Sequence, residues 1–278
     1  MSSAVPESYS IVKNICLERR SVRKYLDKEI PQGVLEDILT ATQSVPTSIN
    51  AQPYKILVVR SKEDKEKLAE TMLLGNERFV KTAAATVLFL YDKQPYKLQS
   101  EYCELQRAAG HSDAGVKGHA KMLNNIAPSN CIMKLFIRTH MWITGLYSNV
   151  IRRGPADAWS DSNTSYAVMQ FCILCQAAGL GNIILGGYDS NRINKKFNIP
   201  SRYGVSVAVV VGYEDKTEQY KPSLRYKPDI YIYIKLFKKK IIINLLSSIH
   251  NNIIYEGKFG QHFSTTLPLL QGKQTWSL

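Results

Sequence analysis

Residues 19–23 place three arginines and a serine within five positions, namely Arg19, Arg20, Ser21 and Arg23. Each guanidinium stays charged and offers a planar fork of donors, and the hydroxyl adds one more donor, so the group suits a phosphate. The same cations also suit the C-terminal end of a surface helix, where they interact favourably with the helix dipole. The segment alone leaves both interpretations open.

A second segment, PTSINAQPY at 46–54, gathers hydroxyl and amide side chains between two prolines. The prolines stiffen the loop, and its side chains concentrate hydrogen-bond donors and acceptors in one place. Taken alone, the segment is better explained as a connection between a helix and a strand.

A third segment, LGGYD at 185–189, places Gly186 and Gly187 directly after a predicted strand. Paired glycines allow positive φ and let a flat ligand approach the backbone. The preceding GLGNII superficially resembles a dinucleotide-binding fingerprint. However, it follows a helix, precedes a strand and lacks the third glycine, so we reject a Rossmann site.

Together, RRSVR, PTSINAQPY, GLGNIILGGYD and a closing KPSLR resemble the nitroreductase family, over about residues 11–236 and weakly between 92 and 158. The resemblance implies an α+β fold, with a central mixed or antiparallel sheet flanked by helices, in a domain-swapped homodimer. It also implies FMN at the dimer interface, NAD(P)H as the electron donor, and a small organic acceptor such as a nitroaromatic or a quinone. The flavin carries the chemistry, so no catalytic side chain and no metal are expected.

The resemblance assigns two groups of cofactor-binding residues near the N-terminus. The segment that binds the FMN phosphate, ribityl chain and pyrimidine edge is matched by Arg19, Arg20, Ser21 and Arg23. The loop that reaches the flavin from the other subunit is matched by Pro46, Thr47, Ser48 and Asn50.

It assigns four further residues along the chain. Asn76 matches an asparagine that bonds the pyrimidine ring, and Arg225 matches a C-terminal arginine on the phosphate. Gly186 and Gly187 match the turn whose backbone N–H groups face N5 and O4 of the flavin.

Two positions depart from the family pattern. Ser223 stands where some members have a lysine, although Lys221 can substitute for it. Phe79 stands where some members have another lysine, which would leave Arg23 to stabilise the charge of reduced flavin. The alternative function is therefore a flavin-binding protein of the same fold with little or no turnover.

Apolar spacing and turn residues predict the elements that position these motifs. Helices are expected at 8–18, from Pro31, from Ser61 with Ser61 as its cap, around 98–109 and 115–126, at 164–178, and from a Ser190 cap to 197. Strands are expected at 55–60, 84–91, 182–185 and 205–213.

Composition excludes several classes of protein. No run of about 18 uncharged apolar residues suggests a membrane span, and the N-terminus lacks the pattern of a signal peptide. Five cysteines at irregular spacing in a chain of 278 residues favour a reducing compartment, so we expect a cytoplasmic protein. The net charge of +13 is concentrated toward the C-terminus without interleaved aromatics, which argues against nucleic-acid binding.

Other motifs carry less chemistry. Cys172 and Cys175 spell a redox pair, but Ile and Leu lie between them in an apolar helix, which favours a buried structural role. The five histidines lack metal-ligand spacing. Tyr96, Tyr102 and Trp142 suit either a substrate pocket or the core.

The C-terminal region is expected to divide near residue 236. KPDIYIYIK at 227–235 alternates like a strand and fits the family's last strand, which embraces the partner subunit. Residues 237–278 form an atypical basic tail, rich in Ile, Asn and Lys, that we expect to be loosely ordered and dispensable for flavin chemistry.

Overall fold

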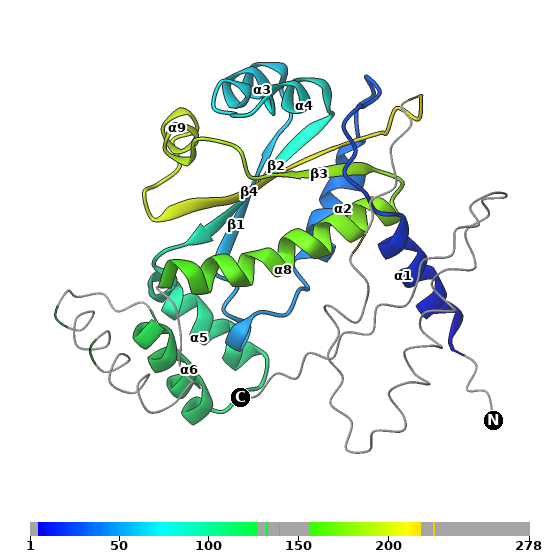
Figure 1. Ribbon diagram of the computed structural model, residues 1–278. Helices are drawn as coiled ribbons and strands as arrows, with labels where there is room; N and C mark the ends of the chain where they lie inside the picture. The colour runs from blue at the N-terminus through cyan, green and yellow to red at the C-terminus, as the bar shows by residue number, and fades with distance from the viewer. Residues whose placement is uncertain (1–4, 127–131, 133–138, 140–155, 218–224, 226–278) are drawn as a thin grey trace, which may run out of the picture. The chain divides into compact units, whose positions relative to one another are not determined.

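The computed structural model describes residues 5–126, 132, 139, 156–217 and 225. The chain divides into two compact units, Met1–Tyr220 and Lys221–Leu278, and only Arg225 is described in the second. Among the described residues, none of the helices has the length and apolar character needed to span a membrane. Figure 1 shows the elements of the first unit: α1 (Glu7–Glu18), α2 (Gln32–Thr42), η1 (Ser48–Asn50), β1 (Tyr54–Val59), α3 (Lys62–Ala69), α4 (Glu77–Thr82), β2 (Ala85–Asp92), η2 (Pro95–Leu98), α5 (Gln99–Ala108), α6 (Asp113–Ile126), α8 (Ala156–Ala177), β3 (Gly181–Leu185), α9 (Ser190–Lys196) and β4 (Tyr203–Gly212).

The four strands form one antiparallel sheet in the order β1-β2-β4-β3. The two central strands, β2 and β4, are buried along most of their length. Burial on both faces explains why both read as continuous apolar runs in the sequence. The expected α+β fold is confirmed, and the sheet is antiparallel within the described residues.

Alternate residues of the central strands serve two separate cores. Val87 and Phe89 face α2 and α8, and the Phe89 and Phe171 rings meet edge to face with centroids 5.6 Å apart. Leu88 and Leu90 face the opposite core, which α3, α4 and α9 cover. This alternation follows from the two-residue period of a strand.

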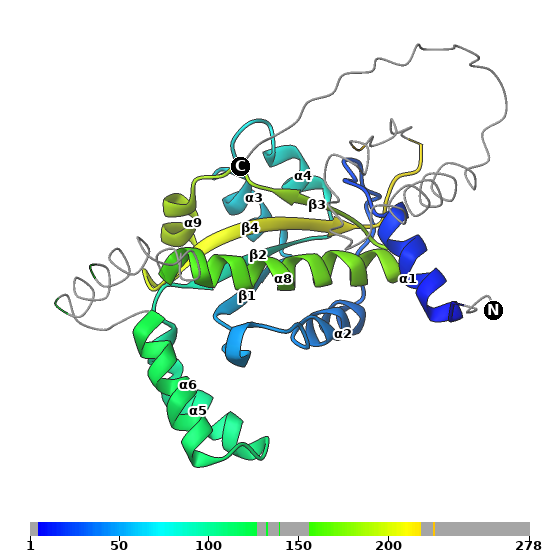
Figure 2. The same cartoon turned by 60° about the horizontal axis from the view of Figure 1, so that its bottom comes forward.

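Helix α8 is the longest described element and runs along the sheet in Figures 1 and 2. It begins at Ala156 rather than at the expected residue 164, because its first two turns, ADAWSDSN, are too polar to show an apolar repeat. Gly179 ends the run with φ +73°, a left-handed conformation that glycine adopts without strain. The predicted helix is present, but it is buried on one face only: Ala167 and Phe171 are buried, whereas Tyr166 and Met169 are exposed.

Caps were predicted correctly at one helix and incorrectly at another. The Ser61 hydroxyl accepts a hydrogen bond from the Asp64 backbone N–H and caps α3, as expected. At α9 the cap is Asp189, whose carboxylate accepts from the Arg192 N–H, and Ser190 is already helical. Asp and Ser cap equally well, so their order alone did not decide the position.

Helices α5 and α6 pack against each other and project away from the sheet (Figure 2). They match the helices expected around 98–109 and 115–126. The apolar stretch 131–150, apart from residues 132 and 139, and the strand predicted at 227–235 lie outside the described residues.

Candidate flavin site

The arginine segment is attached to the edge strand β3. Ser21 forms a parallel bridge with Asn182, and the Val22 N–H donates to the Asn182 carbonyl at 3.0 Å. Val22 is buried against Gly181, where an added Cβ would lie 2.7 Å from a Val22 methyl group. The buried valine turns the flanking side chains outward, so Ser21 is half-buried and Arg23 is exposed.

Two ion pairs fix this segment to the end of β4. Arg20 pairs with Glu214 at 2.5 Å, and Lys24 pairs with Asp215 at 3.0 Å. The Thr217 hydroxyl and backbone N–H donate to Asp215 and, together with Lys24, lower the pKa of that carboxyl to about 2.

The backbone of the loop at 46–50 is bonded to α8, while the side chains of Ser48 and Asn50 are exposed. The Ser48 N–H donates to Asn163 Oδ1 at 2.8 Å. The Thr47 hydroxyl accepts from the Gln52 N–H at 3.0 Å, so it also fixes the loop. A hydroxyl at position 47 is therefore needed for the local conformation.

Gly186 and Gly187 form a turn after β3, in which Gly187 contacts Asn76. The Asn76 Nδ2 donates to the Gly187 carbonyl at 3.0 Å, and the Leu73 N–H donates to the same oxygen at 3.0 Å. A Cβ on Gly187 would lie 2.7 Å from Asn76 Nδ2, whereas a Cβ on Gly186 would meet nothing within 4 Å. Neither glycine has positive φ, so that part of the prediction is wrong: at Gly187 the structure requires space instead.

Strand β3 connects the arginine segment to the glycine turn. Ser21 lies beside Asn182 at its beginning, and Gly186 follows directly after its end. Gly186 lies four residues beyond Asn182 along an extended chain, which corresponds to about 13 Å. The structure thus places cations and an exposed glycine backbone along one sheet edge.

The other predicted residues are the loop at 46–50 and Arg225. For the loop, no hydrogen bond or ion pair to the arginine segment or to the glycine turn is seen within the part of the chain that the structure describes. Arg225 belongs to the separate unit Lys221–Leu278. Its assignment to the phosphate, like the flavin contacts of all the residues named above, stays a prediction.

Comparison with known proteins decides the family. The family model described as "Nitroreductase family" matches residues 16–213. The chain belongs to the nitroreductase family.

Individual relatives agree with this membership. A protein named NADH dehydrogenase from Thermus thermophilus is 25% identical over 201 residues, which cover 72% of this chain and 85% of that protein. A protein named FMN reductase (NAD(P)H) from Bacillus subtilis is 34% identical over 91 residues, 33% of this chain and 35% of its own length. A solved nitroreductase structure from Exiguobacterium sibiricum, in complex with FMN, superposes with a TM-score of 0.61 at 22% identity and covers 84% of this chain and 100% of that one. The nitroreductase-like fold predicted from the motifs is confirmed.

The departure at Phe79 has a structural reason in this nitroreductase. Phe79 is buried in the core that α3, α4 and α9 cover, so a lysine there would have to leave the core or be buried. The guanidinium of the neighbouring Arg78 lies 4.7 Å from the Phe79 ring centroid. Position 79 therefore packs in the core, and the positive charge is on the exposed side chain of Arg78, one residue earlier.

Sequence reasoning did not identify Asn163, and it left Tyr102 open between a substrate pocket and the core. Asn163 lies on α8 and binds the Ser48 backbone, and Tyr102 on α5 donates to the Ile49 carbonyl at 2.9 Å. Tyr102 is a buried residue, in agreement with the core alternative left open for it. No local pattern signals these contacts, because they join positions far apart in the chain.

The helix cysteines take no part in redox chemistry on this geometry. Cys172 and Cys175 are both fully buried and unbonded. Burial raises the pKa of Cys172 to about 12 and raises the pKa of Cys175 further, with the opposing effect of Arg19 on Cys172 being smaller. Both thiols stay protonated at neutral pH, which supports their predicted structural role.

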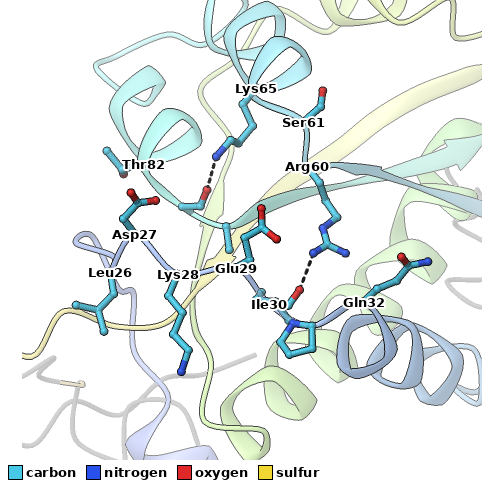
Figure 3. A pocket seen from close by; sticks show the side chains of 13 residues that line it. Leu26, Asp27, Lys28, Glu29, Ile30, Gln32, Arg60, Ser61, Lys65 and Thr82 are labelled. Carbon is cyan, nitrogen blue, oxygen red and sulfur yellow. Dashed lines mark hydrogen bonds between the residues drawn. The ribbon is translucent and has the colours of Figure 1, made fainter.

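A cavity of about 620 Å³ lies between the chain after the arginine segment and the beginning of α3 (Figure 3). Two of its cations bind backbone carbonyls: Arg60 donates to Ile30 at 2.6 Å, and Lys65 donates to Ala83 at 2.9 Å. None of the predicted flavin residues lines it. The Arg60 bond holds the chain between the arginine segment and α2, and the Lys65 bond joins α3 to the residue that follows α4.

Proposed function

We propose that this nitroreductase is an FMN-dependent oxidoreductase that transfers hydride from NAD(P)H, through the flavin, to a small flat acceptor such as a nitroaromatic or a quinone. The observation that carries the proposal is the edge of β3, with cations at its beginning and an exposed glycine backbone about 13 Å further on. FMN has a matching arrangement of groups, because its anionic phosphate and its flat ring system stand at opposite ends of the ribityl chain. The phosphate would lie at the cations and the ring at the glycine backbone.

The residues present fit such a cofactor. The open space at the Gly186 Cβ position is the kind of surface on which a flat ring can lie against the backbone. Arg19, Ser21 and Arg23 would hold the phosphate end and the pyrimidine edge, and Arg20 contributes while it stays paired with Glu214. When bound, FMN supplies the two-electron chemistry, and nearby cations favour its reduced, negatively charged form.

The protein's own residues would bind, orient and shield the flavin. Asn76 fixes the Gly187 carbonyl and so sets the direction of the turn that faces the ring. NAD(P)H and the acceptor would use the same exposed face in succession, which predicts ping-pong kinetics. Since no side chain is assigned a proton-transfer role, water or a backbone group would supply the proton.

A homodimer is part of the proposal. Helix α1 has no buried residue, and its Tyr9, Ile11, Val12 and Leu17 side chains are 53–70% exposed. An apolar helix surface of this kind suits burial against a second copy. In such a dimer the loop at 46–50 would serve the flavin of the partner subunit.

The rival function is flavin binding without useful turnover, and the loss of a lysine at Phe79 favours it. Absorbance of the purified protein in the flavin bands tests binding, and anaerobic addition of NADH or NADPH tests reduction. We expect yellow protein that NAD(P)H bleaches and that a nitroaromatic or a quinone reoxidises. Yellow protein that does not bleach would support the rival, and apo-protein that fails to bind added FMN would remove both.

A further inference from the structure

The loop at 46–50 contains an unusual backbone. Ile49, Asn50 and Gln52 have φ values of 54°, 55° and 45°, all in the left-handed region. That region is uncommon for any residue other than glycine and is a genuine outlier for a β-branched residue such as Ile49. Residues in a strained backbone conformation persist only where the surrounding structure imposes it, and they concentrate at functional sites.

Two buried polar side chains from separate helices impose it. Asn163 on α8 is 2% exposed and accepts from the Ser48 N–H at 2.8 Å. Tyr102 on α5 is 5% exposed and donates to the Ile49 carbonyl at 2.9 Å. The two bonds hold the peptide groups on either side of the Ser48–Ile49 peptide, whose own carbonyl accepts from the Ala51 N–H at 3.1 Å.

Each of the two side chains is itself held in place. Asn163 Nδ2 donates to the Trp159 carbonyl at 2.8 Å, which fixes its amide so that Oδ1 faces Ser48. Two turns further along α8, Gln170 Nε2 donates to the Ala41 carbonyl at 2.8 Å and to the Ser44 hydroxyl at 2.9 Å. Helix α8 therefore anchors both the end of α2 and the loop that follows it.

We propose that Tyr102 and Asn163 are positioning residues that hold Ile49 and Asn50 in the left-handed conformation in which the exposed Ser48 and Asn50 side chains meet the flavin. The inference rests on the proposed function, since it is FMN that the loop would contact. It adds a reason for the strain: without the two bonds, Ile49 would relax to negative φ and turn its neighbours away. Because α5 and α8 both contribute, the α5–α6 hairpin would be coupled to cofactor binding.

The test uses the full-length holoenzyme and substitutions that remove one bonding group each at similar side-chain volume. Tyr102→Phe removes only the hydroxyl, and Asn163→Leu removes the acceptor at similar volume. Each leaves a backbone group unpaired, and we expect FMN affinity to fall on the order of tenfold. Thr164→Val is the matched control, because its hydroxyl makes a buried bond to the Ser160 carbonyl on the same helix. The control should keep the wild-type FMN affinity.

A rescue variant separates positioning from general destabilisation. Glycine adopts positive φ without strain, so Ile49→Gly should restore most of the FMN affinity in the Tyr102→Phe background. Ile49→Gly alone supplies the reference affinity against which the double variant is compared. If Ile49→Gly only adds to the loss, or if Tyr102→Phe and Asn163→Leu match Thr164→Val, the proposal is overturned. Wild-type protein that binds no FMN would instead overturn the proposed function.

Discussion

Gly186 and Gly187 are adjacent, yet the structure constrains them for different reasons. Position 187 faces Asn76, with no room for a methyl group, whereas position 186 is exposed and open. If the flavin ring lies on this turn, the space at position 186 is reserved for ligand, and the space at position 187 is already filled by protein. Substitution by alanine therefore tests ligand binding at position 186 and folding at position 187.

The two alanine variants should separate folding from binding. Gly186→Ala should leave the free energy of unfolding unchanged or raise it by about 0.4–1 kcal/mol, because alanine restricts the unfolded chain. It should nevertheless weaken FMN binding, since the added methyl occupies the ring's place. Gly187→Ala should destabilise by about 1–3 kcal/mol, because it displaces Asn76. Urea denaturation of the apo-protein and FMN titration measure the two quantities, and unchanged FMN affinity in Gly186→Ala would contradict the site.

At the scale of the elements, the sequence predicted those helices and strands whose burial leaves an apolar pattern. The central strands β2 and β4 were recognised because both faces are buried, so apolar residues run without interruption. The beginning of α8 was missed because its polar first turns carry no apolar repeat. Local pattern thus locates the elements but not all of their boundaries.

The candidate site was predictable where composition is distinctive and not where contacts are long-range. The arginines and paired glycines are unusual in type and spacing, so they were identified. The left-handed Ile49 was not, because isoleucine disfavours that conformation and the cause lies in Tyr102 and Asn163. Such strain is decided by tertiary structure, and sequence-local rules cannot reveal it.

The buried thiols of α8 make a prediction about alkaline pH. A thiol in the unfolded chain ionises near pH 9.0, whereas burial raises the pKa of Cys172 to about 12. The raised value means that its stabilising contribution is complete below pH 9 and is lost as the pH rises toward 12. By pH 10.5 this costs about 2 kcal/mol per thiol.

Urea denaturation with a reductant at pH 8 and pH 10.5 measures this loss. The pH dependence should be weaker in Cys172→Ala, Cys175→Ala and their double variant, while the exposed Cys16→Ala should follow the wild type. An equal loss in the double variant and the wild type would show that the helix thiols are not the cause.

At the scale of the whole molecule, a substitution on α1 tests the proposed homodimer. Its exposed apolar side chains should lie in the dimer interface, so Val12→Glu should weaken association and FMN binding together, because each flavin would need a loop from the partner. Lys13→Glu is the matched control, since Lys13 is an exposed polar neighbour on the same helix. Light scattering with FMN titration measures both effects. A Val12→Glu monomer that still binds FMN stoichiometrically would contradict the shared site.

The last prediction concerns where the flavin-binding chain ends. The first compact unit closes at Tyr220, yet Arg225 and the predicted strand at 227–235 lie beyond it, so a unit that folds would still lack a phosphate ligand. A stop after Lys235 should keep FMN binding and NAD(P)H oxidation, and a stop after Tyr220 should lose the cofactor. Full-length Arg225→Ala should lose about 1.5–3 kcal/mol of FMN affinity, the range for hydrogen bonds to charged groups, and so isolates that residue from the strand. If the stop after Lys235 alone abolished flavin binding, residues 237–278 would belong to the fold, and the boundary at 236 would be wrong.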